Sequence, residues 1–355
     1  MKGIGFKKLF CECFSDSREW ADWFFASVYS PEQELSMGAD GSADGKPVSG
    51  LLLQDYAFKY AGSMLNIGYI CCAGTAPEAR GRGMMSMLMK KALQTARKRG
   101  MAAVTLIPAS DHLYFFYDKF GFATVFYLIP LRFTSLHPFV EQEGVFECKP
   151  THEILNSLET PRNGCVCHTP QQFNRIMEDL AMEGGYAVAT RDSEGNRAIA
   201  FATADNESIT VRTIMATEDR TALGALMKIR EHFGPLEMTA WIPPRGDHSP
   251  LRSRGMMRIT DVTSILSALA HRESGLKRLI RVRDRLLPAN CGLYHIHDGR
   301  VQMTALPADA PLPEGIRTDL DVTPDVLARI LFSNPHIGEI FNIPTTQPML
   351  PLMLE

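Results

Sequence analysis

Apolar and polar positions predict a helix followed by two strands near the start of the chain. Residues 17–29 repeat large apolar side chains three and four positions apart, as on one face of an α-helix. Residues 49–60 and 65–75 are expected to be strands. The polar, glycine-rich stretch at residues 37–50 fits a hairpin between two strands.

A strand–loop–helix–strand unit is expected between Tyr69 and Phe126. An apolar strand leads into a loop of proline, arginine and glycine, a long helix begins at about Met84, and residues 103–107 form the next strand. A short aromatic helix and a further strand follow. A unit of this length is a βαβ crossover, which joins parallel strands. The loop therefore lies at the carboxyl end of its first strand, the edge of a sheet that ligands favour.

A second α/β unit without an obvious site is expected over about residues 135–270. Where the first unit has arginine and glycine, this one has an acidic loop, Thr217-Glu218-Asp219-Arg220. Acidic residues at that place argue against a second phosphate site, because they repel phosphate oxygens. The expected strands are 185–190, 198–202, 208–215 and 237–242, with a helix over 222–233.

The pattern changes again after Gly275. Alternating residues predict a pair of strands, with turns at 288–290 and at Asp298-Gly299. A helix-like stretch over 324–332 and an apolar, proline-containing tail follow. We expect a third, smaller α+β domain here.

Composition narrows the function without identifying it. The 355 residues are 45% hydrophobic and 22% charged, as in an ordinary globular protein, and this length predicts two or three domains. A net charge of −3 provides no positive field for a nucleic acid backbone. No segment approaches the roughly 18 consecutive apolar residues that span a bilayer, and the first residues have too short an apolar run for a signal peptide. We therefore expect a cytoplasmic protein with neither nucleic acid nor membrane as a partner.

The eight cysteines do not predict a metal site. None has the C-x-x-C spacing of zinc sites, and the one tempting cluster, Cys165-Val166-Cys167-His168, lacks a second pair at a matching distance. Free thiols in a reducing compartment are expected, and no metal.

The strongest local signal is the loop before the long helix, Pro77-Glu78-Ala79-Arg80-Gly81-Arg82-Gly83-Met84. Its glycines let the backbone turn so that several N–H groups converge on one point, and a helix N-terminus adds about half a positive charge there. Arg80 and Arg82 can add charge-assisted hydrogen bonds. The loop is neither a Walker loop nor the G-x-G-x-x-G dinucleotide fingerprint, and it predicts a pyrophosphate site.

This loop resembles the coenzyme A-binding segment of GNAT-superfamily N-acetyltransferases, whose pattern is Arg/Gln-x-x-Gly-x-Gly/Ala. Arg80 and Gly83 match it, and the bulky Met85 at its last position is similar to the Eis (enhanced intracellular survival) subgroup. The resemblance implies acetyl-CoA as co-substrate, and backbone N–H groups at the end of the preceding strand that bind the thioester oxygen. The implied cofactor-binding residues are Ala73, Gly74, Thr75, Arg80, Gly81, Arg82, Gly83, Met84, Met85, Ser86 and Ser110.

A second match follows at residues 110–122, SDHLYFFYDKFGF, which resembles the GNAT segment N-x-x-A-x-x-F-Y-x-K-x-G-F. Tyr117 falls on the family's tyrosine, and Ser110 stands where asparagine is usual. A packed aromatic on an amphipathic helix is the other interpretation of Tyr117. The chemistry favours a role as general acid, because a phenol with a pKa of about 10 can protonate a leaving thiolate whose thiol has a pKa of about 8.5.

The strand before the loop offers no base for the acceptor amine, since residues 66–72 contain no carboxylate. The base must therefore come from another part of the chain. In the Eis-like subgroup the resemblance implies that the terminal carboxylate, here Glu355, reaches the active site. The tail is apolar and contains several prolines, so it is expected to be ordered. It could reach the active site, or it could only pack on the surface of a domain.

The Eis-like plan implies an α/β (α+β) fold with tandem GNAT-like mixed-sheet domains and a small domain similar to sterol carrier protein. The expected boundaries are 1–134 for the catalytic domain, 135–272 for a degenerate GNAT-like domain and 273–355 for the last domain with its tail. The acceptor would be the primary amine of a small molecule or peptide, and the oligomeric state, a homo-oligomer included, is left open. A non-catalytic acyl-CoA-binding or scaffold protein is the alternative, motivated by the missing carboxylate and by the absence of the family's usual first strand.

Overall fold

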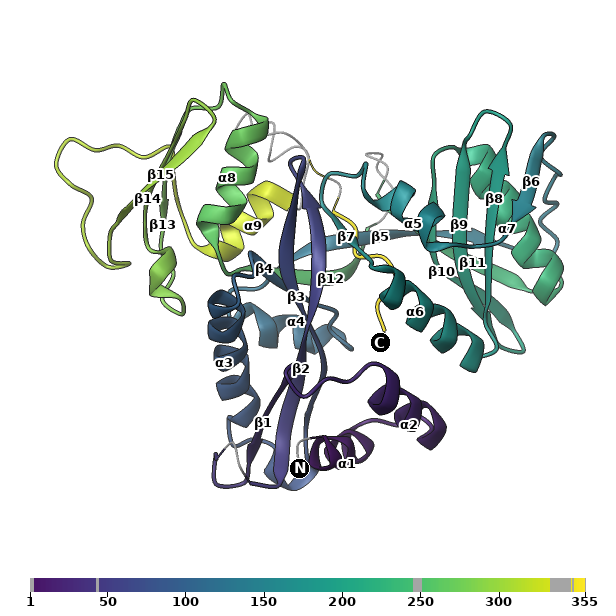
Figure 1. Cartoon of the computed structure of the whole chain (residues 1–355), viewed down its shortest axis with the longest axis horizontal. Coiled ribbons are helices and arrows are strands. Elements are labelled where there is room, and N and C mark those ends of the chain that lie inside the picture. The colour runs from purple at the N-terminus through teal and green to yellow at the C-terminus, as the bar shows by residue number, and fades with distance from the viewer. Residues whose placement is uncertain (1–2, 43–44, 245–250, 333–345, 347, 355) are drawn as a thin grey trace. The chain divides into compact units, whose positions relative to one another are not determined.

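The computed structural model describes residues 3–42, 45–244, 251–332, 346 and 348–354 of the chain (Figure 1). Its contacts divide these residues into two compact units. Unit 1 comprises the described residues of 1–126 and 254–346, and unit 2 comprises residues 127–253 and the tail segment 348–354. The fold is mixed α/β, as the sequence predicts. No helix within the described ranges is both long enough and apolar enough to cross a membrane.

Unit 1 contains two sheets. In the first, the strand order is β1-β2-β3-β4-β12, and only the β3–β4 pair is parallel. In the second, the order is β15-β14-β13-β16. The strands of unit 1 are β1 (Glu34–Gly38), β2 (Pro47–Tyr60), β3 (Ser63–Thr75), β4 (Ala103–Leu106), β12 (Arg252–Ile259, which begins in unit 2), β13 (Arg278–Val282), β14 (Gly292–His297), β15 (Arg300–Ala305) and β16 (Leu320–Val322).

Helices cover both faces of the first sheet. The long helix α3 packs on β1, β2 and β3 and buries Leu88, Met89 and Leu93, whereas α1 packs on the other face of β2 and β3 (Figure 1). The helices of unit 1 are α1 (Ile4–Cys13), α2 (Arg18–Ser27), α3 (Met84–Lys98), α4 (Asp111–Asp118), α8 (Val262–Arg272) and α9 (Pro324–Phe332), with 3₁₀ turns at Pro77–Ala79 and Pro288–Asn290.

The sequence predicts most of these elements correctly. The helix expected at 17–29 is α2, and Ser17 caps it by accepting a hydrogen bond of 3.1 Å from the Trp20 N–H. The hairpin expected at residues 37–50 joins β1 and β2. The strands expected at 49–60 and 65–75, which are β2 and β3, and the helix from Met84 are also confirmed. In contrast, α1 is not predicted, because its apolar face is only Phe6, Leu9 and Phe10 and no side chain caps its start.

Unit 2 is one mixed sheet with helices on it. The strand order is β5-β11-β10-β9-β8-β6, and only β10 and β11 run parallel. The expected strands of this region and the helix α7 are confirmed. The elements are β5 (Ala123–Phe133, which begins in unit 1), β6 (Val145–Cys148), α5 (His152–Glu159), β7 (Cys165–Cys167), α6 (Pro170–Met182), β8 (Tyr186–Asp192), β9 (Arg197–Ala204), β10 (Ser208–Ala216), α7 (Asp219–Phe233) and β11 (Glu237–Ile242).

The tail segment 348–354 packs in unit 2 as an extended chain. Met349 forms a parallel bridge with Cys165, because its N–H donates to the Gly164 carbonyl (2.7 Å) and its carbonyl accepts from the Val166 N–H (3.0 Å). Residues 349–354 are all buried. The tail is therefore fixed by both backbone hydrogen bonds and apolar burial rather than solvated.

His168 adds a side-chain anchor for this tail. Its Nε2 lies 2.6 Å from the Leu352 carbonyl, and its Nδ1 lies 2.6 Å from Glu159 Oε1. The backbone N–H of His168 also donates to Glu159 Oε2 at 3.0 Å, and both side chains are fully buried. The imidazole of His168, in the sequence cluster 165–168, thus links α5 to the tail through hydrogen bonds. The eight cysteines are free, and no group of three or more potential metal ligands occurs among the described residues.

Candidate active site

The parallel strands β3 and β4 separate after a short pairing. Residues 67–70 pair with residues 103–106, and β3 then continues alone on that side to Thr75. Residues 67–70 are buried, whereas residues 71–75 are partly exposed. The last five residues of β3 therefore present backbone groups that β4 does not pair, and such groups are available to a ligand.

A β-bulge changes the direction of these backbone groups. The β2–β3 register shifts between Cys71 and Gly74, so that Cys72 and Ala73 together face a single residue of β2. Cys72 has a φ of 53°, in the left-handed region that residues with a Cβ rarely adopt. A bulge of this kind re-aims the N–H groups next to it. Of the three residues predicted to bind the thioester oxygen, Ala73 lies in this bulge, and Gly74 and Thr75 follow it directly.

The end of α1 packs directly on the bulge. A Cβ built on Gly74 would lie 3.0 Å from both Cβ and Sγ of Cys13 and 3.2 Å from a ring carbon of Phe14. Glycine fits this approach without strain, whereas a side chain at residue 74 would require Cys13 or Phe14 to shift by a few tenths of an ångström. This contact cannot be predicted from the sequence, since it depends on α1, which the pattern of the first residues does not indicate.

The thiols beside the bulge are held in the neutral form. The pKa of Cys72 is raised, first because its thiol hydrogen-bonds with Cys71 and next because the thiol is shielded from water, although the residue as a whole is partly exposed. Burial also raises the pKa of Cys13, although the nearby Arg80 opposes this. Because the thiolate is the nucleophilic form of cysteine, neither side chain is prepared for covalent acyl transfer.

The predicted loop leaves β3 and is open to solvent. The Arg80 Nε donates to the Thr75 carbonyl at 3.1 Å, and the Arg82 Nη2 donates to the Ala39 carbonyl at 3.1 Å. These bonds hold both arginines near the loop backbone, yet both side chains remain exposed. The guanidinium groups therefore stay available for an anion at the same time as they brace the loop.

The glycines of the loop take conformations that keep its surface clear. Gly81 and Gly83 have φ values of 75° and 77°, and a Cβ at either position would meet no atom within 4 Å. Their role is thus backbone conformation and access, not the relief of a clash. The sequence prediction for these two residues rests on the same property.

The N-terminus of α3 adds backbone amides to the candidate anion site. Gly83 is its N-cap residue, and the first helical hydrogen bond runs from the Met87 N–H to the Gly83 carbonyl (3.1 Å). The N–H groups of Met84, Met85 and Ser86 precede that bond and belong to the first turn, which contains no acidic residue. Free amides, the helix dipole and two arginines fit a pyrophosphate, so the residues present suit the binding of acetyl-CoA.

Tyr117 lies on α4 and is 7% exposed. Its ring packs against Phe116 and Phe122 in the same apolar core cluster that contains Met84 and borders Ala73 and Met85. Burial raises its pKa to about 12. The side chain is therefore a neutral phenol at any working pH, able to donate its proton but not to act as a base.

Two further predicted residues are less closely tied to this site. Ser110 is the N-cap residue of α4, and its Oγ lies 3.1 Å from His112 Nδ1. Among the described residues no hydrogen bond joins Ser110 to residues 80–83. Glu355, predicted as the base, lies outside the described residues.

Comparison with known proteins agrees with this geometry. Residues 4–125 match the family model of the acetyltransferase (GNAT) domain. This segment contains the bulge, the loop, the start of α3 and Tyr117, and the match supports an acetyltransferase function. No curated protein matches the chain in sequence.

Solved structures resemble nearly the whole chain in fold. Eis1 from Mycobacterium abscessus is 15% identical with a TM-score of 0.71, over 98% of this chain and 96% of that one. A probable N-acyltransferase from Enterococcus faecalis V583 is 14% identical with a TM-score of 0.74, over 96% and 90%. A GCN5-related N-acetyltransferase from Anabaena variabilis is 17% identical with a TM-score of 0.72, over 95% and 89%. At such identities the likeness concerns the fold.

Proposed function

We propose that the protein transfers the acetyl group of acetyl-CoA to a primary amine of a small molecule or peptide, with Tyr117 as the general acid. The observation that carries the proposal is the combination of an unpaired, bulged strand end with an open, basic helix N-terminus in one βαβ unit. A plain surface turn would require neither the bulge at Cys72 nor the two left-handed glycines.

The parts of the site would have distinct roles. The amides of Met84, Met85 and Ser86, with Arg80 and Arg82, would hold the pyrophosphate. The N–H groups at the end of β3, at residues 73–75, would donate to the thioester oxygen as it gains negative charge. These groups are fixed by the sheet and the bulge, so little reorganisation is needed when the charge develops.

The acyl group would pass directly to the amine. The neutral thiols of Cys13 and Cys72 disfavour an acyl-cysteine intermediate. The amine nitrogen would attack the thioester carbon, the carbon–sulfur bond would then break, and Tyr117 would donate its proton to the leaving sulfur. The proton lost from the amine nitrogen would restore the phenol, so that the products are the amide and free coenzyme A.

The raised pKa of Tyr117 limits how this proton moves. A phenol with a pKa of about 12 is weaker than a thiol of pKa about 8.5, so full transfer to a free thiolate is uphill by roughly 5 kcal/mol. A turnover of about 10 per second corresponds to a total activation barrier of roughly 16 kcal/mol, so an uphill proton transfer of this size is compatible with catalysis. Tyr117 would therefore act mainly as a hydrogen-bond donor to the sulfur while the bond breaks.

The test is the Tyr117→Phe variant, with Tyr114→Phe on the same helix as the matched control. Thiol release from acetyl-CoA is measured with a panel of primary amines, and cofactor affinity by calorimetry. We expect kcat to fall by roughly 10²–10⁴-fold in Tyr117→Phe with the acetyl-CoA affinity nearly unchanged, and to change little in the control. Equal losses of affinity and turnover would exclude the acid role.

A protein that binds acyl-CoA without catalysis is the second candidate. It is favoured by one observation: residues 66–75 of β3 provide no carboxylate to accept the proton of the amine. In that case the wild type would bind acetyl-CoA and release no thiol with any amine. The same assay separates the two candidates.

The wider organisation is also part of the proposal. We infer an Eis-like plan in which unit 2 contains a degenerate GNAT-like domain, supported by its own parallel pair β10–β11 and by the fold likeness to Eis1. The four-stranded sheet β15-β14-β13-β16 with α8 and α9 would be the sterol-carrier-like domain. The boundaries 1–134, 135–272 and 273–355 belong to this proposal, as does acetyl-CoA as the donor.

A further inference from the structure

Unit 2 repeats the local arrangement of the candidate active site. Residues 208–211 of β10 pair in parallel with residues 237–240 of β11, and β10 then continues to Ala216 without that partner. The helix α7 starts three residues later at Asp219, as α3 follows β3 in unit 1. The carboxyl ends of two separating parallel strands and the start of the crossover helix therefore meet at one place, where ligands commonly bind.

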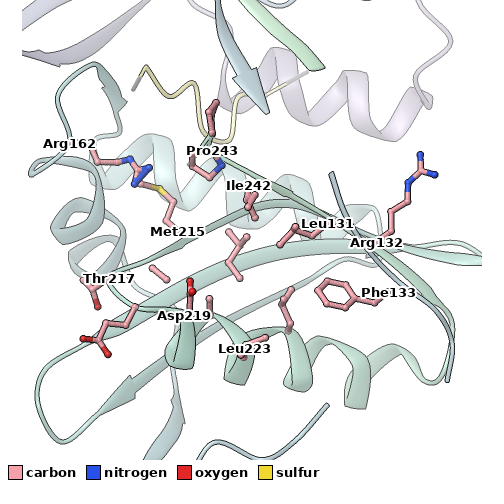
Figure 2. Close-up of a pocket in the computed structure, with 16 residues that line it drawn as sticks. Leu131, Arg132, Phe133, Arg162, Met215, Thr217, Asp219, Leu223, Ile242 and Pro243 are labelled. Atoms are coloured by element: carbon pink, nitrogen blue, oxygen red, sulfur yellow. The ribbon is translucent and has the colours of Figure 1, made fainter. Parts of the chain in front are cut away.

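A cavity of about 630 Å³ opens at this place (Figure 2). Most of its lining is apolar, and Ile214, Leu226 and Ile242 are no more than 5% exposed and belong to the core of unit 2. Leu131 of β5 adds a further wall. A cavity of this size with apolar walls and few polar groups is typical of small-molecule sites.

The polar groups at the start of α7 exclude a phosphate ligand. Glu218 is the N-cap residue of α7 and Asp219 lies in its first turn, where unit 1 has Gly83 and no acidic residue. The two carboxylates beside the helix N-terminus neutralise the positive end of the helix dipole, and they repel polyanions. The cavity is thus unsuited to coenzyme A, although its position in the fold corresponds to the first site.

Arg162 supplies the opposite charge. It comes from the turn after α5, and Figure 2 shows its guanidinium group at the end of the cavity that Met215 lines. The Arg162 Nε is buried and has no hydrogen-bond acceptor among the described residues. A buried donor without a partner is destabilising, and more so when it is charged, so an acceptor supplied by a ligand would remove this penalty. Arg132, in contrast, is exposed and points away from the cavity.

We propose that this cavity binds a monocarboxylate with an apolar body, its carboxylate on Arg162 and its body along the apolar walls. A carboxylate matches the fork of a guanidinium group, whose Nε and one Nη can donate to its two oxygens. One negative group is matched by one guanidinium, while Glu218 and Asp219 disfavour dicarboxylates and phosphates. The site would be independent of the acetyltransferase chemistry proposed for unit 1.

The test is calorimetric titration of the full chain with octanoate, beside octylamine of the same chain length. Arg162→Gln keeps most of the side-chain size and removes the charge. Arg191→Gln, at an exposed position of β8, is the matched control. We expect octanoate to bind the wild type and the control equally, and Arg162→Gln to bind it roughly tenfold or more weakly, because a charged hydrogen-bond pair is lost. Octylamine should bind the wild type more weakly than octanoate.

A second variant locates the binding. Ala222→Phe places a ring in the cavity from α7 and should abolish octanoate binding, while Arg82→Glu in unit 1 should leave it unchanged. Hydrogen exchange of β8 and β9 checks that unit 2 remains folded in each variant. No octanoate binding by the wild type, equal binding by Arg162→Gln, or displacement of octanoate by acetyl-CoA would each overturn the proposal.

Discussion

Removing the imidazole of His168 is expected to destabilise unit 2 strongly. The Glu159 carboxylate and the His168 ring are both fully buried, 2.6 Å apart, and the ring also holds the Leu352 carbonyl. In His168→Ala the carboxylate keeps only the backbone N–H of residue 168 as a described donor. Leaving a buried carboxylate without its side-chain hydrogen-bond partner costs about 3–5 kcal/mol, a large share of the 5–15 kcal/mol that stabilises an ordinary domain.

The double variant identifies the origin of this cost. In Glu159→Gln with His168→Ala no charge is left buried, so we expect it to be more stable than His168→Ala alone. Arg212→Ala breaks the partly exposed Arg212–Glu183 pair of the same unit and should cost about 1 kcal/mol or less. Urea unfolding gives the free energies, and hydrogen exchange at Val166 and Met349 reports whether the tail is released. A double variant less stable than His168→Ala, or a tail as protected as in the wild type, would refute the reasoning.

Two further predictions concern unit 1. Asp284→Ala leaves the buried Arg258 without its carboxylate partner at 2.6 Å and should lower the free energy of unfolding, measured in urea, by about 3–5 kcal/mol. Asp309→Ala breaks a fully exposed pair with Arg285 and should leave that free energy almost unchanged. The pKa of Asp261 is lowered in the folded chain: burial raises it, but the ion pair with Arg97 and hydrogen bonds with Ser264 outweigh burial. The contribution of Asp261 to stability is therefore present above the ordinary aspartate pKa of about 4 and is lost as the pH falls below it. Asp261→Asn should reduce the loss of stability with falling pH in urea unfolding. An acid dependence equal to that of the wild type would contradict this.

The loop predicted to bind pyrophosphate could be recognised in the sequence because its signal is local. Arg80 to Gly83 combine charge, conformational freedom and the start of an amphipathic helix within a few residues, and each of these properties acts without distant partners. The same holds for the second parallel pair and α7, whose apolar periodicity is regular. Elements of this kind are specified by neighbouring residues alone.

Features that depend on distant contacts could not be predicted. The left-handed φ of Cys72 follows from the register of β2 and β3, and nothing in a cysteine residue indicates it. The contact of Cys13 with Gly74 requires α1 to pack on the sheet. The sequence indicates His168 only as a potential metal ligand, because its partners Glu159 and Leu352 lie 9 and 184 residues away.

The central claim, that the start of α3 and its loop form an acetyl-CoA site, is tested most directly by calorimetric titration of the protein with acetyl-CoA beside Arg82→Glu. The account predicts binding by the wild type that the charge reversal abolishes, with the variant still folded by circular dichroism, because a carboxylate would replace a cation at the pyrophosphate. No binding by the wild type, or binding that Arg82→Glu leaves unchanged, would contradict it.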